Sequence, residues 1–181
     1  MKRRSTRLAA LALLVGLSSM AVVAGQRIFT NPKPDAELRQ LFPAAAAFSP
    51  LGGQPLHYRA YANNPKADLS APPIGYAFWT TDLVPYEHGY HGAIHILVGL
   101  DLKATIAGVV VDYDSEPYGY FSVEPPKFAV QFKGKSIKDS FRVGVDVDAV
   151  SRASLSINSA TRAIRDSARM VANQLLQDAV K

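Results

Sequence analysis

Apolar residues recur every three or four positions between residues 157 and 175, while arginines and an aspartate fill many of the positions between them. This spacing places the apolar side chains on one face of an α-helix and the charged side chains on the opposite face. It predicts a long amphipathic helix that lies across a sheet. A shorter helix is predicted to begin near Asp35, which suits the N-cap position, and to end at Pro43.

Strands are predicted at residues 56–62, 74–81, 93–100 and 106–113, and the last three of these stretches are rich in β-branched and aromatic residues. Residues 101–104 form a connection of hairpin length, which favours antiparallel pairing of the two strands that flank it. Residues 128–132 are predicted to add another strand. Strands followed by a packing helix are typical of an α+β domain, here a small antiparallel sheet packed by the long C-terminal helix.

The N-terminal segment has the layout of a secretory signal. Four basic residues among the first seven precede an apolar run at residues 8–24, whose length is close to that of a membrane-spanning helix. We therefore predict a signal peptide or membrane anchor at residues 1–25, a linker at residues 26–34 and one domain at residues 35–181. The predicted domain lies in the periplasm, either free or anchored to the inner membrane by the N-terminal segment.

Charge and cysteine content exclude several functions. The formal net charge is +5, but four positive charges lie in the N-terminal segment, and the rest of the chain carries only about +1. Nucleic-acid binding depends on a clustered basic surface, so no nucleic-acid partner is expected. The chain has no cysteine, which excludes thiolate-bound iron–sulfur clusters and thiol catalysis.

A turn rich in hydroxyl groups, at residues 148–156, leads into the predicted C-terminal helix. The first N–H groups of a helix have no partners within the helix, and the helix dipole favours negative charge there, so a phosphate group suits this place. A serine hydroxyl at the same point can form a hydrogen bond to the phosphate or an ester with it. Taken alone, the pattern is more typical of ordinary helix capping.

The order Asp-x-x-Ser-x-Ala-Ser in this turn resembles the flavin-attachment motif of FMN-binding domains, usually written Asp-x-x-Ser-Gly-Ala-Thr. Such domains occur in the Rnf and Na+-translocating NADH:quinone reductase complexes and in the membrane regulator of nitrous-oxide reductase. The motif positions here are Asp148, Ser151, Arg152, Ala153 and Ser154. Arg152 replaces the usual glycine, and Ser154 replaces the usual threonine. The resemblance implies FMN as the cofactor, bound either through a phosphoester to Ser154 or without a covalent bond.

Other stretches resemble the same family and follow one another in the same order, namely residues 89–92, 106–109, 115–119 and 128–135. Residues 41–43 and 75–78 resemble the branch of the nitrous-oxide reductase regulator in particular. The resemblance covers residues 38–176. It implies that the flavin is contacted by Gly89, Tyr90, Gly92, Glu116, Tyr118, Gly119, Leu155 and Ser156 in addition to the motif itself. Tyr118 is expected to stack on the flavin ring. Without the resemblance, both glycine-containing segments would be interpreted as plain turns.

Three histidines, His88, His91 and His95, also invite a metal interpretation. His91 and His95 would share one face of a helix, but the residues that follow His91 predict a strand. Residues four apart in a strand are about 13 Å apart, which is too far for one zinc ion. No metal site is therefore predicted.

The resemblance implies an electron carrier that is loaded by a flavin transferase, with Asp148 recognised by that enzyme, and that exchanges electrons with a membrane or periplasmic redox partner. No catalytic residues are assigned, because no Ser-His-Asp order is evident. Asp112 and Asp114 are expected to be solvated at a strand end. Two alternatives stay open: a flavin oxidoreductase that acts on a small molecule, and a flavin-free assembly or sensory domain with the same fold.

Overall fold

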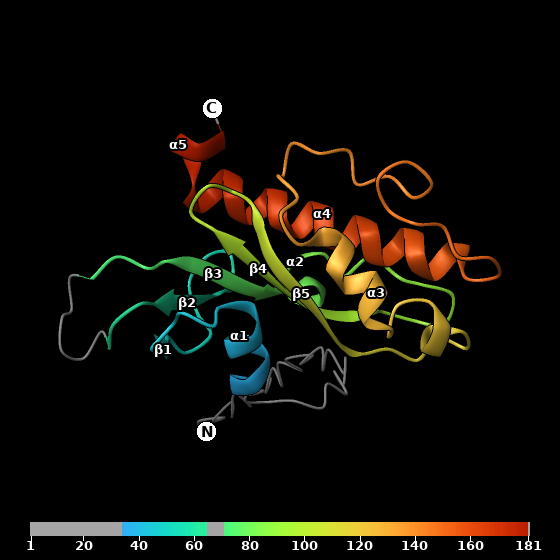
Figure 1. The fold of residues 1–181 in the computed structure, drawn as a ribbon, viewed down its shortest axis with the longest axis horizontal. Coiled ribbons are helices and arrows are strands. Elements are labelled where there is room, and N and C mark those ends of the chain that lie inside the picture. The colour runs from blue at the N-terminus through green and yellow to red at the C-terminus, as the bar shows by residue number, and fades with distance from the viewer. Residues whose placement is uncertain (1–33, 65–70, 181) are drawn as a thin grey trace, which may run out of the picture.

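The computed structural model describes residues 34–64 and 71–180 (Figure 1). The predicted signal or anchor segment at residues 1–25, and the linker as far as residue 33, lie outside the described residues. In chain order the elements are α1 (Asp35–Leu41), β1 (Ala47–Phe48), β2 (Tyr58–Tyr61), β3 (Gly75–Trp79), α2 (Thr80–Leu83), β4 (His95–Asp101), β5 (Ile106–Tyr113), the 3-10 turn η1 (Gly119–Phe121), α3 (Pro126–Ala129), the 3-10 turn η2 (Val130–Phe132), α4 (Ser154–Leu175) and α5 (Gln177–Val180).

The described strands form one antiparallel sheet in the order β1-β2-β3-β4-β5, so each strand pairs with its neighbours in the sequence. The predicted hairpin between β4 and β5 is confirmed. Its turn is held by the carboxylate of Asp101, which accepts the N–H groups of Lys103 at 2.8 Å and Thr105 at 2.9 Å. Together with the long C-terminal helix, this sheet confirms the α+β fold class.

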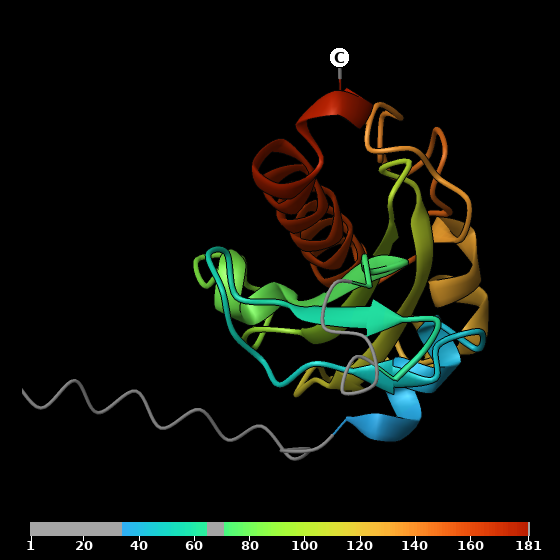
Figure 2. The same ribbon diagram turned by 90° about the vertical axis from the view of Figure 1, so that its left-hand side faces the viewer.

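The sheet separates two apolar clusters, because successive side chains of a strand point to opposite faces. Along β4, Ile96 and Val98 belong to the cluster that includes α4, whereas Leu97 between them belongs to the cluster that includes α1. Figure 2 shows α4 and α1 on opposite sides of the sheet. All of β4 except its last residue is buried, since both of its faces are covered.

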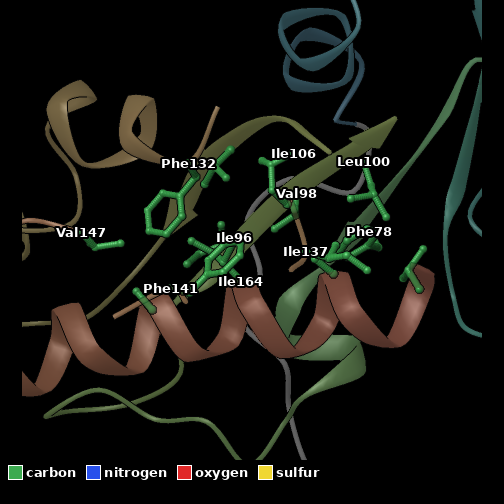
Figure 3. Packing of buried hydrophobic residues seen from close by; sticks show 14 of the residues in the cluster. Phe78, Ile96, Val98, Leu100, Ile106, Phe132, Ile137, Phe141, Val147 and Ile164 are labelled. Atoms are coloured by element: carbon green, nitrogen blue, oxygen red, sulfur yellow. The ribbon is translucent and has the colours of Figure 1, made fainter. Parts of the chain in front are cut away.

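The predicted C-terminal helix is confirmed as α4, which begins at Ser154 and runs for 22 residues. Its inner face carries Ile157 and Ile164, both of which are fully buried. They belong to one cluster with the sheet and with the rings of Phe132 and Phe141, which come from the segment before the helix (Figure 3). Close packing of this kind fixes the position of α4, and with it the position of the first helical turn.

The strand predicted at residues 128–132 is wrong, because this stretch forms α3 and η2. Phe128 and Phe132 are four residues apart, so a helical conformation turns both rings into the core, where their centroids are 5.0 Å apart. A proline stands at the first position of α3, where its fixed φ and missing N–H favour a helix start. A short apolar run fits a strand or a helix equally well, and the proline decides for the helix.

Two element boundaries also differ from the predictions. Asp35 is the first helical residue of α1, and Pro34 occupies the N-cap position that was expected for Asp35. The strand predicted at residues 74–81 ends at Trp79, where α2 begins. In the described part of the chain, no helix has the length and apolar character needed to cross a membrane.

Candidate functional site

The N-terminus of α4 borders a cavity of about 350 Å³. Its walls are formed by Tyr90, Pro117, Tyr118 and residues 152–156. No side-chain oxygen caps α4, and Ile157 donates to the carbonyl of Ala153 at 3.0 Å. The N–H groups of residues 154–156 precede this bond, and such groups at the start of a helix bind anions. An anionic group therefore has donors at this end of the cavity.

The three serines of the turn have different surroundings. Ser154 lines the cavity and is exposed, as the first residue of α4. Ser156 also lines the cavity, but it is only 3 % exposed and donates its hydroxyl to Oε2 of Glu116. Ser151 is exposed and lies outside the cavity lining. Ser154 thus combines an accessible hydroxyl with a place in the cavity.

Glu116 is buried beside the cavity, at 7 % exposure, and its carboxylate is surrounded by donors. Oε2 accepts the N–H of Tyr90 at 2.7 Å, in addition to the Ser156 hydroxyl. Oε1 accepts the N–H groups of His91 at 2.8 Å and Gly92 at 3.2 Å. Burial raises the pKa of the Glu116 carboxyl, but the hydrogen bonds from Ser156 and the three backbone amides outweigh burial and hold the pKa below its usual value.

Two glycines allow carboxylates to approach the backbone closely. A Cβ at Gly89 would lie 2.6 Å from the carboxyl carbon of Glu116 and 2.7 Å from each of its oxygens. A Cβ at Gly119 would collide with Oδ1 of Asp114 and would lie 2.8 Å from Oε1 of Glu124. At both positions, glycine is needed because a larger residue would displace a carboxylate.

Two tyrosines flank the mouth of the cavity. Tyr90 is 66 % exposed and Tyr118 is 42 % exposed, although both line the cavity. Tyr118 lies beside the ring of Phe121, with centroids 5.4 Å apart, and Tyr90 stacks on His91 at 5.6 Å. Exposed rings at the rim of a cavity suit a flat aromatic ligand with one polar end.

Residues 89–169 match the family model of the FMN-binding domain. These residues form an FMN-binding domain. The matched segment contains every residue that lines the cavity. Because the matched domain binds FMN, FMN is the cofactor and the protein is a flavin-binding protein. A search of curated proteins found no significant match to the chain.

The cavity of this FMN-binding domain fits its cofactor. The uncapped first turn of α4 supplies donors for a phosphate group, and the rings of Tyr90 and Tyr118 supply apolar surface for a flat ring system. The volume also lies within the usual range of ligand sites, about 300–1,000 Å³. When bound, FMN supplies the reversible uptake and release of electrons, which protein side chains alone do not perform.

Arg152 has an unusual backbone conformation in the FMN-binding domain. Its φ is +69°, in the left-handed region that glycine adopts freely and that costs other residues about 1–2 kcal/mol. A glycine at this position, as in the motif that the sequence resembles, would adopt this conformation without that cost. Arg152 is one of the residues that line the cavity, and its guanidinium makes no hydrogen bond or ion pair with the part of the chain that the structure describes.

Asp148 lies apart from the cavity at α4. It borders a separate cavity of about 230 Å³, together with Lys127 and Gln131. The N–H of Asp148 donates to Oε1 of Gln131 at 2.7 Å, and the residue is exposed. Of the predicted site residues, Tyr90, Tyr118 and residues 152–156 line the cavity at α4. Glu116 lies beside it and bonds to two of its lining residues, Tyr90 and Ser156. The predicted site residues that are absent from the lining are Gly89, Gly92, Glu116, Gly119, Asp148 and Ser151.

The three histidines have different partners. His88 contacts the carbonyl of Pro85, and His91 contacts the carbonyl of Ser115. His95 is buried, with its Nδ1 2.7 Å from Oγ1 of Thr81, and its ring stacks on Trp79 with centroids 4.0 Å apart. Among residues 34–64 and 71–180, no group of three or more His, Cys, Asp or Glu side chains is arranged to hold a metal ion.

The expectation of solvated carboxylates is wrong for Asp112, while Asp114 is half-buried. The Asp112 side chain is 8 % exposed, and its Oδ2 lies 3.9 Å from Nε2 of His95. Burial, followed by the nearby charge of Glu37, raises the pKa of Asp112. Oδ1 of Asp114 accepts the N–H of Glu116 at 2.9 Å, and burial raises the pKa of Asp114 as well. The periodicity of β5 could not reveal this, because Glu37, whose charge acts on Asp112, belongs to α1 at the start of the domain.

Two features of the site were missed by sequence reasoning. Pro117 lines the cavity, although only its neighbours in the Ser-Glu-Pro-Tyr-Gly stretch were assigned to the flavin. The bond between Glu116 and Ser156 joins residues 40 positions apart. No local pattern signals such a contact, since it depends on how α4 packs on the sheet.

Proposed function

We propose that this FMN-binding protein is an exported electron carrier whose FMN is joined to Ser154 by a phosphoester. The observation that carries the proposal is the contrast among the three serines. Ser154 alone has an exposed hydroxyl on the cavity wall, since Ser156 is engaged by Glu116 and Ser151 lies outside the lining. In the proposed ester, the Ser154 oxygen replaces the leaving group on the phosphorus of an activated flavin nucleotide and gives up its proton.

Each wall of the cavity has a proposed role. The N–H groups of residues 154–156 hold the phosphate, and the guanidinium of Arg152 adds a charged donor at the same end. Tyr90 and Tyr118 contact the flavin ring from opposite segments of the chain. Asp148 lies outside this cavity and remains available to a flavin transferase, which is the proposed maturation partner.

The partner in electron transfer is proposed to be a membrane or periplasmic redox protein. This proposal is supported by the solvent exposure of two residues that line the cavity, since Tyr90 is 66 % exposed and Leu155 is 62 % exposed. An exposed rim allows another protein to approach the ring. The signal-like sequence at residues 1–25 supports export to the periplasm, and an uncleaved segment would keep the domain near a membrane partner and raise its effective concentration.

The proposed domain extends beyond the matched segment, over residues 35–181. Two observations support this extent. Strand β3 pairs with β4 from Gly75 to Trp79, and the apolar cluster that includes α1 contains Leu97 of β4. Elements of residues 34–64 and 71–88 therefore share a sheet and a core with the matched segment.

The covalent attachment is tested by in-gel flavin fluorescence. The full chain is produced with a flavin transferase in an exporting host and denatured on a gel. Wild type and Ser154→Thr are expected to fluoresce, Ser154→Ala to be dark but folded, and the matched control Ser151→Ala to fluoresce. Persistent fluorescence in Ser154→Ala would contradict the attachment site. A wild-type protein purified without any flavin would favour the flavin-free assembly or sensory domain.

The relay function is tested by stopped-flow reduction of the loaded protein. Membranes from the source organism are expected to reduce the flavin rapidly, whereas soluble NADH is expected to reduce it slowly. Fast reduction by NADH alone would contradict the relay and favour an oxidoreductase that acts on a small molecule.

A further inference from the structure

We propose that Glu116 is a positioning residue of the FMN site, which holds the turn at residues 89–92 against the first turn of α4 and so sets the width of the cavity. The inference rests on the proposed placement of FMN at α4. It differs from the assignment that the family resemblance implies, in which Glu116 contacts the flavin directly.

The hydrogen bonds of the Glu116 carboxylate are already made within the protein. A carboxylate offers about four acceptor positions on its two oxygens. Here the four are matched by Tyr90, His91, Gly92 and the hydroxyl of Ser156. A flavin could gain a bond to this carboxylate only by displacing one of these donors. Glu116 therefore acts on the flavin through the groups that it holds.

Those groups come from two segments of the chain, and both segments contribute residues to the cavity lining. Tyr90 and Ser156 both line it, and both donate to the same oxygen, Oε2. The turn that carries Tyr90 is closed by its own bond, from the N–H of Gly89 to the carbonyl of Gly92 at 2.7 Å. That bond fixes the shape of the turn, but it does not fix the distance from the turn to α4. The carboxylate supplies a link at the cavity, and the ion pair of Glu87 with Arg162 of α4 lies outside the cavity lining.

Glu116, residues 89–92 and Ser156 together are called the clasp. Three substitutions disturb it in different ways. Glu116→Gln keeps the shape of the side chain but replaces one acceptor oxygen with an N–H2 group, which is itself a donor and faces other donors. Ser156→Ala removes the hydrogen bond between Glu116 and α4 and leaves the turn bonded. Gly89→Ala leaves the charge in place but brings a Cβ to within 2.7 Å of the carboxylate, which must then shift.

A matched control is available in Asp146, a second carboxylate that holds a turn through backbone N–H groups. It accepts the N–H groups of Phe141 at 3.0 Å and Arg142 at 2.5 Å, and it is absent from the cavity lining. Asp146→Asn therefore disturbs a clasp of the same chemistry without disturbing the proposed FMN site.

The test measures the Kd of FMN by quenching of flavin fluorescence at pH 7, in the Ser154→Ala background so that binding is reversible. Adding Glu116→Gln is expected to raise the Kd at least tenfold, and Ser156→Ala or Gly89→Ala at least threefold. Asp146→Asn is expected to change the Kd by less than twofold, even where it lowers the melting temperature of the flavin-free protein as much as one of the clasp variants does. Visible circular dichroism of the bound flavin should weaken only in the clasp variants, because the ring loses its fixed orientation.

The outcomes separate this inference from the proposed function. If the Ser154→Ala parent binds FMN and all three clasp variants bind it equally well, the positioning role is overturned while the FMN site stands. If the Kd rises in the clasp variants and in Asp146→Asn in proportion to the lost melting temperature, the role of Glu116 is structural only, and the inference is again overturned. If the parent does not bind FMN, the site at α4 and the inference fall together. Should Glu116→Gln fail to fold, Ser156→Ala and Gly89→Ala decide the result.

Discussion

Two carboxylates of this domain gather backbone N–H groups, but they connect very different parts of the chain. Glu116 joins a turn 24–26 residues earlier to a helix 40 residues later. Asp146 joins only near neighbours, since its partners Phe141, Arg142 and Lys135 lie 5, 4 and 11 residues away. Glu116 is buried, whereas the Asp146 side chain is 23 % exposed.

The chemistry of the two clasps is similar, so the difference lies in what each one holds. In both, burial raises the pKa of the carboxyl and the hydrogen bonds outweigh it, which lowers the pKa of Glu116 and brings that of Asp146 to about 2. The Asp146 clasp stabilises its own loop. The Glu116 clasp joins two segments whose side chains form one cavity. Only a clasp of the second kind links the stability of the fold to the shape of a binding site.

The largest expected effect comes from breaking the buried clasp. Glu116→Gln is expected to lower the free energy of unfolding by about 3 kcal/mol, because the buried Ser156 hydroxyl and three part-buried backbone N–H groups lose a charged acceptor at once. The measurement is urea denaturation of the flavin-free protein at pH 7. A loss below about 1 kcal/mol would show that water or a rearranged turn satisfies those donors.

A smaller loss is expected at the more exposed clasp. Asp146→Asn should lower the free energy of unfolding by about 1.5 kcal/mol, since the Asp146 side chain is 23 % exposed and its donors can turn to water. Urea denaturation under the same conditions gives the comparison. Equal losses for Asp146→Asn and Glu116→Gln would remove the distinction between the two regions.

Arg152 lies between Asp146 and Ser156 in the sequence, in the segment that connects the two clasps. A substitution at Arg152 is expected to raise the free energy of unfolding instead of lowering it. Arg152→Gly is expected to raise the free energy of unfolding by about 1 kcal/mol, because glycine relieves the left-handed conformation. The same change should weaken reversible FMN binding, in the Ser154→Ala background, through loss of one charge-assisted contact of about 1.5–3 kcal/mol. Denaturation and FMN titration are measured on the same samples. Unchanged FMN affinity would show that the guanidinium points elsewhere.

The smallest effect is the dependence of stability on pH. Both carboxyl groups have a lowered pKa in the folded state, so each contributes stability above its unfolded pKa and loses it as the pH falls through the folded pKa. The loss begins near pH 4.5 for Glu116 and runs from about pH 3.8 to about pH 2 for Asp146. Between pH 5 and pH 4, the wild type should lose less than about 1 kcal/mol, and Glu116→Gln should lose less than the wild type. Identical slopes would contradict a lowered pKa at Glu116.

The sequence predicted the parts of the fold that local patterns encode. The amphipathic period of α4 and the hairpin of β4 and β5 depend on residues close together in the chain, and both are confirmed. The stretch at residues 128–132 was misassigned because a short apolar run fits either period. Its two phenylalanines reach the core from a helical turn instead.

The candidate site was predictable only through the family motif, and then only in part. The motif led to Ser154 and to the start of α4, which borders the cavity. The positive φ of Arg152 could not be predicted, because an arginine in the sequence does not indicate a left-handed conformation. The bond between Glu116 and Ser156 depends on tertiary packing. Backbone conformation and contacts between residues distant in the chain are therefore the main features of the site that the sequence could not predict.

The stack of Trp79 on His95 gives the molecule an optical reporter. Trp79 is the only tryptophan in the chain, and it is 4 % exposed in the apolar cluster that includes α1, on the sheet face opposite α4. Its ultraviolet emission will shift to longer wavelength when the sheet opens to solvent, whereas the visible absorption of flavin follows cofactor loading. Tryptophan emission and flavin absorption recorded on one sample can therefore distinguish protein that has lost its cofactor from protein that has unfolded.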